Sequence, residues 1–205
     1  MADKKRAWKF WVSRTLLILL AFGVFWLINL IWFRPLDIRH FYDRTFVRLV
    51  LQSPETVTQL GIPVLYNWTK DEWDDVSDAH LWKSFLQTRE DYATLLSYDF
   101  ARQSQANQLN TKILRTFLKN KVDGEEFFYH NYPVSQFWGI QSSLPGLLTS
   151  KHKLASKSDI KGYIARLKGF EIKFDKVLEG LKIREQKGII PPKFVIGRVL
   201  DEMRD

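Results

Sequence analysis

The chain combines one long uncharged apolar run with a series of shorter segments of helical periodicity. Residues 15–33 read TLLILLAFGVFWLINLIWF, nineteen residues without a charged side chain. Beyond Pro35, apolar residues recur three and four positions apart almost throughout, which places them on one face of an α-helix. The pattern predicts an all-α protein, in which an N-terminal transmembrane helix precedes a multi-helix domain.

Residues 15–33 fit a membrane anchor better than the two alternatives. As a helix that rises ~1.5 Å per residue, the run spans about 28 Å, close to the ~30 Å hydrocarbon core of a bilayer. In a cleaved signal peptide, an apolar stretch of about 7–15 residues leads directly to a cleavage site, whereas ten more residues of this run follow Ala21-Phe22-Gly23. A buried core helix would be more amphipathic. We therefore expect an uncleaved signal-anchor in contact with the lipid bilayer.

The basic residues beside this run predict which way it crosses the membrane. Five stand in residues 1–14, and four stand in the fifteen residues that follow the run. Short flanking segments rich in Lys and Arg tend to stay in the cytoplasm. We therefore expect a single-pass protein of the cytoplasmic membrane with a basic cytoplasmic tail at 1–14. Residues 34–205 would then lie outside the cytoplasm, in the periplasm or at the cell exterior.

Turn and cap residues divide the remainder into helical segments. Ser53-Pro54 ends one helix and starts the next, which Gly61 ends, and Asp123-Gly124 is a turn. Thr69-Lys70-Asp71-Glu72 has the spacing of a capping box and predicts a helical turn near Trp73. The expected helical segments are 38–50, 54–60, a turn near 73, 78–96, 105–123, 158–187 and 193–205.

Residues 131–150 interrupt the periodicity. Asn131-Tyr132-Pro133, Gly139 and Leu144-Pro145-Gly146 break any long helix, and amide side chains alternate with aromatic and aliphatic ones. Ordered segments of this length and composition are either functional or packed against a core. We expect a long, partly irregular loop here.

The segment 158–187 carries a continuous apolar stripe over three heptads, which suits a coiled coil or a helix of a bundle. Three glycines interrupt the segment, and each costs about 1 kcal/mol relative to alanine, so close helix packing is expected to compensate. The stripe comprises Ile160, Tyr163, Ile164, Leu167, Phe170, Phe174, Val177, Leu178 and Leu181.

Composition and charge narrow the function classes. The absence of Cys excludes a disulfide scaffold, a thiol nucleophile and a Cys-ligated zinc site. The formal charge of +8 divides into +4 over residues 1–14, −2 over 34–150 and +6 over 151–205. A nucleic-acid interpretation would rest on the C-terminal part alone, where a basic helix face is more often solvated. No nucleic-acid partner is expected.

No catalytic constellation stands out. The four histidines are scattered, and the sequence contains no HExxH motif, no GxSxG motif and no Gly-rich phosphate loop. Glu126 and His130 are four residues apart, a spacing that suits an ion pair on one helix face better than metal ligation. The sequence therefore assigns no catalytic, cofactor-binding or metal-ligating residue.

Three other features favour structural interpretations. The acidic residues of the segment 71–78 fit charge at a helix N-terminus better than a Ca²⁺ loop. Asn67-Trp68-Thr69 matches an N-glycosylation acceptor, which matters only in a eukaryotic secretory route. Three tryptophans could line a ligand site, although burial in the core is the ordinary role of such side chains; they are Trp73, Trp82 and Trp138.

Three groups of residues together resemble a known family. The first joins Asn131-Tyr132-Pro133-Val134 to Gly139-Ile140-Gln141 and Leu144-Pro145. The second joins Asp159 and Tyr163-Ile164-Ala165-Arg166-Leu167 to Gly188-Ile189-Ile190-Pro191-Pro192-Lys193-Phe194-Val195. The third joins Phe41-Tyr42 to Leu49, Ser53-Pro54-Glu55 and Leu60-Gly61. Over roughly residues 38–200, the chain resembles the N-terminal part of the bacterial family called domain of unknown function 885.

The resemblance implies an all-α fold of the kind seen in helical zinc peptidases. Members are typically extracytoplasmic, often lipoproteins, and several hundred residues longer, with an HExxH-type zinc helix in the later part of the chain. No residue of that helix has a counterpart here, so zinc is expected only if the chain continues into that region. A transmembrane run also replaces the lipobox Cys of a lipoprotein.

Two hypotheses follow. In the first, residues 34–205 are the incomplete N-terminal lobe of a membrane-anchored, peptidase-like metalloenzyme. This lobe would be inactive alone and would pack against the rest of its own longer chain. Its segment 131–150 would form one wall of a substrate cleft. In the second, they are a stand-alone tethered module that binds a partner protein through the segment 158–187. The resemblance and the abrupt end at Asp205 favour the first hypothesis.

Overall fold

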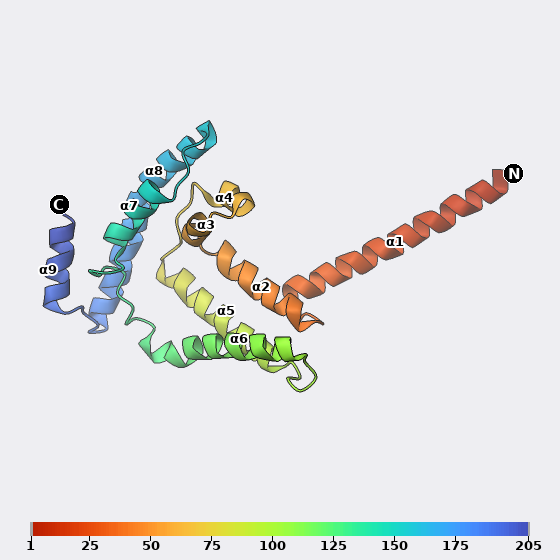
Figure 1. Ribbon diagram of the computed structural model, residues 1–205, viewed down its shortest axis with the longest axis horizontal. Coiled ribbons are helices and arrows are strands. Elements are labelled where there is room, and N and C mark those ends of the chain that lie inside the picture. Colours follow the sequence, from red (N-terminus) through yellow and green to blue (C-terminus); the bar gives the residue numbers. More distant parts are fainter. Residues whose placement is uncertain (1, 205) are drawn as a thin grey trace.

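The computed structural model describes residues 2–204, and over this range it is helical apart from the connections (Figure 1). No strand occurs among the described residues, which confirms the all-α prediction. The helices are α1 (Ala2–Trp32), α2 (Ile38–Leu51), α3 (Pro54–Leu60), α4 (Pro63–Thr69), α5 (Asp78–Leu96), α6 (Gln105–Asp123), the 3₁₀ helix η1 (Gly124–Phe127), α7 (Ile140–Ser150), α8 (Lys157–Gln186) and α9 (Lys193–Glu202).

Helix α1 joins the basic tail and the apolar run in one continuous helix. Its window Arg14–Ile31 has a mean hydropathy of 2.1, and none of the window is buried. Figure 1 shows α1 projecting alone from the rest of the molecule. It is the one helix in the described part of the chain that is long and apolar enough to cross a membrane. The side chains of residues 1–10, Ser13 and Trp32, and the terminus at Asp205, lie outside the described residues.

Helices α2, α5 and α6 form a three-helix unit beside the end of α1 (Figure 1). Helices α5 and α6 pack against each other, and Ser77 and Ser104 cap their N-termini with side-chain oxygens. The Tyr42 hydroxyl ties α2 to α6 through a 3.0 Å hydrogen bond to Asn107 O. The buried core of this unit consists of Ile38, Phe41, Leu95 and Leu118.

Helices α3 and α4 are short. The sequence predicts α3 with its observed bounds, whereas α4 was not expected. Each has a proline in its first turn, where the missing N–H costs no intrahelical bond. Gly61 lies between them with a φ of 65°, a left-handed conformation that glycine adopts without steric cost. The pair packs on α2 through a second buried cluster of Val50, Val57 and Tyr66.

Residues 70–77 do not form the helical turn that was expected near Trp73. Helix α4 ends at Thr69, and the chain then runs without regular structure from Glu72 to α5. Two backbone carbonyls of this segment, Glu72 O and Asp74 O, accept hydrogen bonds from side chains of α8. The capping-box prediction was wrong because these tertiary bonds hold the backbone in an extended path.

The segment 131–150 is irregular in its first half only. Residues 131–139 form turns, but α7 begins at Ile140 and continues through Pro145. A proline at this position removes one intrahelical hydrogen bond, and three side chains on the inner face of α7 compensate by burial. They are Leu144, Leu147 and Leu148.

Candidate functional site

Helix α8 turns a charged face toward the body of the protein. Seven-residue spacing places Asp159, Arg166 and Lys173 on one side of the helix, because two turns contain about seven residues. The seven-residue spacing of these charged residues is the sequence signal for this face. The apolar stripe beside it instead predicted that the apolar residues are the buried ones. The buried residues of α8 are Asp159, Gly162, Arg166, Lys173, Val177, Gly180 and Arg184.

The apolar stripe predicted for this helix is covered along one edge only. Ile160, Ile164, Leu167 and Leu178 are each 45–50% exposed. The stripe is offset by roughly a quarter of a turn from the buried face, so its outer edge faces solvent. The close packing expected at glycine is confirmed at Gly162, where an added Cβ would lie 3.1 Å from Lys70 O.

Arg166 is the centre of the charged face and is fully buried. Its Nε donates to Glu72 O at 2.9 Å, and its Nη2 donates to Thr58 Oγ1 at 2.7 Å. Longer bonds of 3.3 and 3.4 Å reach Thr69 O and Pro54 O. Burial lowers the pKa of the guanidinium from its usual value, although nearby acidic groups oppose the shift. One side chain thus joins α8 to α3, to α4 and to the segment before α5.

His152 adds a neutral imidazole to this network. Its Nδ1 lies 3.3 Å from Nη1 of Arg166, which can only donate, so Nδ1 must be the unprotonated nitrogen. The protonated Nε2 then donates to Asp159 O at 2.9 Å. Burial lowers the pKa of His152 below its ordinary value of 6.5, and the charge of Arg166 adds to the effect. The ring is therefore uncharged at pH 7.

The start of α8 is fixed by an ion pair between Lys70 and Asp159, whose Nζ and Oδ1 atoms are 2.9 Å apart. Both side chains are about nine-tenths buried. Asp159 also closes the capping box of α8 by accepting from Ser156 N. Hydrogen bonds from Lys70 and Ser156 lower the pKa of the Asp159 carboxyl.

The acidic segment 71–78 serves the structure of neighbouring elements. Asp74 accepts from Glu55 N at 2.9 Å and from Ser53 Oγ at 2.6 Å, so it caps α3 from across the chain. Lys173 Nζ donates to Asp74 O and contacts Glu55 Oε1, both at 2.7 Å. These contacts support the structural interpretation of the acidic cluster, because they stabilise the N-terminus of α3.

Asp75 links the same segment to the next turn of α8. It accepts from Ser77 N at 2.9 Å and pairs with Lys176 at 3.0 Å. Burial opposes ionisation, but the hydrogen bonds from Ser77 and Lys176 prevail and lower the pKa of Asp75 to about 2. Both partners of the ion pair remain more than a third exposed.

A pocket of about 350 Å³ lies between the segment 131–144 and the C-terminal half of α8. The segment contributes an aromatic wall, and α8 contributes a basic one. Glu55, Val76 and Leu81 complete the lining at the α3 and α5 side. The remaining lining residues are Asn131, Tyr132, Pro133, Trp138, Ile140, Ser143, Leu144, Lys173, Lys176, Val177, Gly180 and Arg184.

Arg184 and Tyr132 hold the pocket's irregular wall in place. Arg184 Nε donates to Tyr129 O at 3.0 Å and to Asn131 O at 3.1 Å. The Tyr132 hydroxyl donates to Ile190 O, 3.4 Å away, in the link between α8 and α9. The Asn-Tyr-Pro element is thereby bonded to α8 and to the link between α8 and α9.

Gly139 allows the tight turn that precedes α7. A Cβ at this position would lie 2.4 Å from Ser135 O and 1.9 Å from Gln141 Oε1, both far inside contact distance. The Gln141 amide also donates to Ser135 O at 2.8 Å and to Glu202 Oε2 at 2.9 Å. The turn is therefore tied to α9 as well as to itself.

The three tryptophans considered from the sequence have different environments. Trp73 stacks on Phe170 with ring centroids 5.2 Å apart and donates to Arg166 O, and Trp82 stacks on Phe85. These two have the packing role expected of them. Trp138 instead lines the pocket and is 89% exposed, so the interpretation as a core residue was wrong for this side chain.

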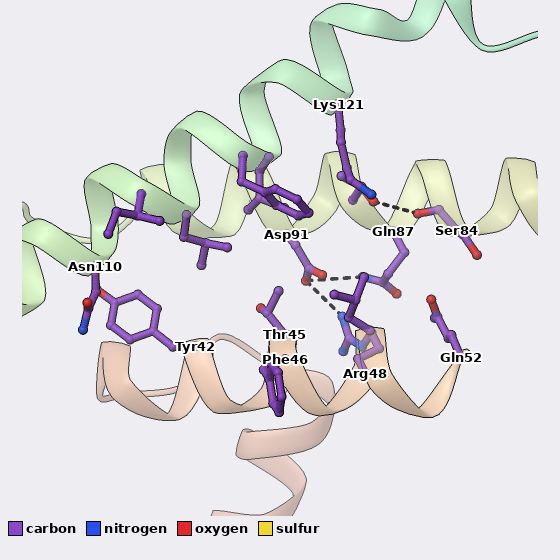
Figure 2. Close-up of a pocket in the computed structure, with 16 residues that line it drawn as sticks. Tyr42, Thr45, Phe46, Arg48, Gln52, Ser84, Gln87, Asp91, Asn110 and Lys121 are labelled. Atoms are coloured by element: carbon purple, nitrogen blue, oxygen red, sulfur yellow. Dashed lines mark hydrogen bonds and ion pairs between the residues drawn. The ribbon is translucent and has the colours of Figure 1, made fainter. Parts of the chain in front are cut away.

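A second hollow of about 350 Å³ runs between α2 and the α5–α6 pair (Figure 2). Figure 2 shows Asp91 and Arg48 reaching into it from opposite sides. Arg48 Nη1 donates to Asp91 Oδ1 at 2.9 Å, and burial raises the pKa of this carboxyl against the influence of Arg48. The lining includes four large apolar side chains that are 46–61% exposed, although the helical periodicity of 38–50 and 105–123 places them on one face of each helix; they are Phe46, Leu49, Ile113 and Phe117.

The residues described provide no donor set for a metal. Glu126 and His130 do not share an α-helical face, because α6 ends at Asp123 and η1 takes over at Gly124. Within residues 2–204 no three His, Asp or Glu side chains converge as metal ligands do.

Comparison with known proteins identifies the family. The family model described as "Bacterial protein of unknown function (DUF885)" matches residues 54–205, about three quarters of the chain. Comparison with curated proteins and with solved structures gives no match. The matched range includes the pocket wall at 131–144, the charged face of α8 and the link at 188–193. The chain therefore belongs to the DUF885 family of bacterial proteins of unknown function.

Proposed function

We propose that the protein is the membrane-anchored helical lobe of a peptidase-like protein, and that the pocket between residues 131–144 and α8 holds a polypeptide substrate. One observation carries the proposal. Elements far apart in the chain meet beside this pocket, and two of them, Asn131-Tyr132-Pro133 and the link at 188–193, are among the residues that resemble the family. Tyr132 bonds to Ile190, and Asn131 bonds to Arg184.

The pocket's chemistry suits a peptide. Tyr132 and Trp138 offer aromatic surface to an apolar side chain, while Lys173 and Lys176 stand on the opposite wall. A mainly apolar hollow with a few fixed polar groups is typical of ligand sites. Lys176 is paired with a partly exposed carboxylate, and such ion pairs contribute little, so the cation can turn toward a substrate carboxylate at small cost.

In this proposal the described residues bind and orient the peptide, and none of them breaks a bond. Arg184 and Gly139 keep the pocket wall fixed, which lowers the entropy lost on binding. The transmembrane helix keeps the lobe at the bilayer.

Peptide binding tests the proposal. Two fluorescein-labelled octapeptides of one sequence, with a free or an amidated C-terminus, are titrated with the detergent-solubilised chain and followed by fluorescence anisotropy. We expect the free carboxylate to bind more tightly. W138A should weaken binding about fivefold, because an aromatic contact contributes about 1 kcal/mol. The matched control is F137A, since Phe137 is 74% exposed beside Trp138 but does not line the pocket. Equal losses in both variants would contradict the proposal.

The orientation in the membrane is a separate part of the proposal. With the N-terminus in the cytoplasm, a phosphatase fused after Asp205 is active and a cytoplasmic reporter at the same place is not. The support is the excess of basic residues before the apolar run. The reverse reporter pattern would place the helical lobe in the cytoplasm.

A second function is favoured by the open edge of α8. The four aliphatic side chains there, Ile160, Ile164, Leu167 and Leu178, suit a tethered module that binds a partner protein. An immunoblot against residues 60–120, with mass spectrometry of the band, separates the two functions. A native product several hundred residues longer supports the peptidase lobe. A stable product at 24.3 kDa supports the module.

A further inference from the structure

Four large apolar side chains are exposed at one corner of the helical body, at the end of α3, along α4 and in the turn between α7 and α8. They are Leu60, Val64, Trp68 and Leu154, with 57, 62, 67 and 60% of their surfaces exposed. None belongs to the substrate pocket or to the groove of Figure 2. The two proposed functions therefore do not account for them.

The α7–α8 turn and α4 lie against each other at this corner. Lys153 N donates to the Tyr66 hydroxyl at 2.9 Å, and Lys153 Nζ lies 5.1 Å from the centre of the Tyr66 ring. Val64 and Trp68 are four residues apart and share a face of α4, whereas Tyr66 points to the other side. Inward contacts are thus made by Tyr66, and the apolar face of α4 is left on the outside.

The α7–α8 turn at this corner is basic, and two exposed acidic residues, Asp71 and Glu72, follow α4. Residues 151–157 contain Lys151, Lys153 and Lys157 and no acidic residue, and all three lysines are exposed. Asp159 is the nearest acidic residue of this turn, and Lys70 neutralises it in a buried pair. Exposed lysines on a surface that also exposes tryptophan and leucine are typical of contact with anionic lipids.

The corner faces the side on which α1 lies. Arg44 donates to Leu30 O and to Phe33 O, so the end of α1 is bound to α2. The Tyr98 hydroxyl donates to Pro35 O and binds the segment after α5 to the same connection. In Figure 1, α1 leaves the body at α2, and α4 and the start of α8 form the edge of the body on that side.

We propose that this corner rests on the anionic surface of the bilayer that α1 crosses. The lysines contact lipid phosphates, and Trp68 and Leu154 enter the headgroup region. A second attachment fixes the tilt of the helical body and therefore the direction in which the substrate pocket faces. The inference rests on the proposed membrane anchor, and it adds a lipid-binding surface outside the membrane span.

The natural chain has no Cys, so a single introduced Cys carries a fluorophore at one chosen site. We would place NBD on L154C in the full chain, reconstituted in phosphatidylcholine nanodiscs with and without phosphatidylglycerol, and measure quenching by lipids spin-labelled near the headgroup. The control is F127C, because Phe127 is 58% exposed in η1, away from this corner. We expect quenching at residue 154 in anionic discs, weaker quenching in neutral discs and none at residue 127.

Charge reversal completes the test. K151E/K153E/K157E should abolish quenching at residue 154, whereas K112E/K119E/K121E on α6 should leave it unchanged. Equal quenching at residues 154 and 127, in protein that still co-purifies with the discs, would overturn this inference. The proposal that α1 anchors the protein in the membrane would not be affected. Protein that does not enter discs at all would overturn both. A blue shift at residue 154 that depends on protein concentration, and not on spin-labelled lipid, would assign the corner to a second copy instead.

Discussion

Replacing Arg166 by methionine tests whether the charged face of α8 holds the helical domain together. The guanidinium is fully buried and donates to acceptors on α3, on α4 and in the segment 70–77. Methionine has a similar length and flexible shape, so the variant removes the donors without leaving a large cavity. Glu72 O then loses its side-chain donor, and Thr58 Oγ1 keeps only its own bond to Pro54 O.

The expected loss follows from the two shortest bonds. An acceptor left buried and unsatisfied costs about 1–3 kcal/mol, and Glu72 O and Thr58 Oγ1 both lose their donor. Release of the desolvated charge offsets part of this cost. We expect a net loss of about 3 kcal/mol, and for a domain of this size the unfolding temperature falls by about 6–12 °C.

Thermal unfolding followed by circular dichroism in mild detergent measures this loss. R102M is the matched control, because the Arg102 side chain is 88% exposed and its removal should change stability by less than about 0.5 kcal/mol. T58V alone and together with R166M completes a double-mutant cycle, with an expected coupling above about 0.5 kcal/mol. An R166M protein as stable as the natural chain would refute the reasoning.

Three other variants test separate contacts. G139A should lower the free energy of unfolding by about 1–3 kcal/mol, because the added Cβ overpacks against Ser135 O. G146A, with open space around the added Cβ, should be neutral or slightly stabilising in the same melts. Equal effects of the two variants would contradict this. W73F should cost about 1 kcal/mol, because the indole donates to Arg166 O, and an unchanged melting temperature would argue against that bond. The lowered pKa of His152 means that the unfolded chain binds this proton first, so stability present above pH 6.5 should decline as the pH falls toward the folded-state pKa. H152Q should remove this part of the pH dependence of unfolding, and an identical profile would exclude His152 as its source.

Local signals in the sequence were sufficient wherever a helix depends on its own residues. The apolar run predicts α1 without reference to any other element, since none of its window is buried. Proline at the start of α3 and glycine after it set the ends of that helix through backbone geometry alone. The predicted helix starts at residues 78 and 105 also agree with the structure, in which Ser77 and Ser104 cap α5 and α6.

Local signals failed where distant groups compete for the backbone. The capping-box spacing at Thr69 is real, but Arg166 and Lys173 take the carbonyls of the following residues and hold them extended. Similarly, a charged residue every seven positions in α8 has the pattern of a solvated face. Only the presence of carbonyls, hydroxyls and carboxylates on facing elements makes burial of that face favourable.

The candidate site likewise has features that the sequence indicates and features that only the structure shows. The sequence indicated that residues 131–150 are special and supplied the family resemblance, because turn-forming and aromatic residues cluster there. It could not show that Trp138 is exposed at the rim of a pocket, since side-chain exposure depends on what packs nearby. It also left Phe46 and Leu49 on a helix face expected to be packed, and the structure opens that face into a groove.

The sequence by itself determined the helical class, the long apolar helix, the main helix ends and the family, because these depend on periodicity, caps and short motifs within a few residues. Tertiary structure decided which face of α8 is buried, the extended path of residues 70–77 and the pocket between α8 and the Asn-Tyr-Pro element. Those features arise from hydrogen bonds between residues far apart in the chain, such as Arg166 and Glu72, 94 positions apart, and Arg184 and Asn131, 53 positions apart. Their free energy depends on removing both partners from water together, which local sequence does not encode.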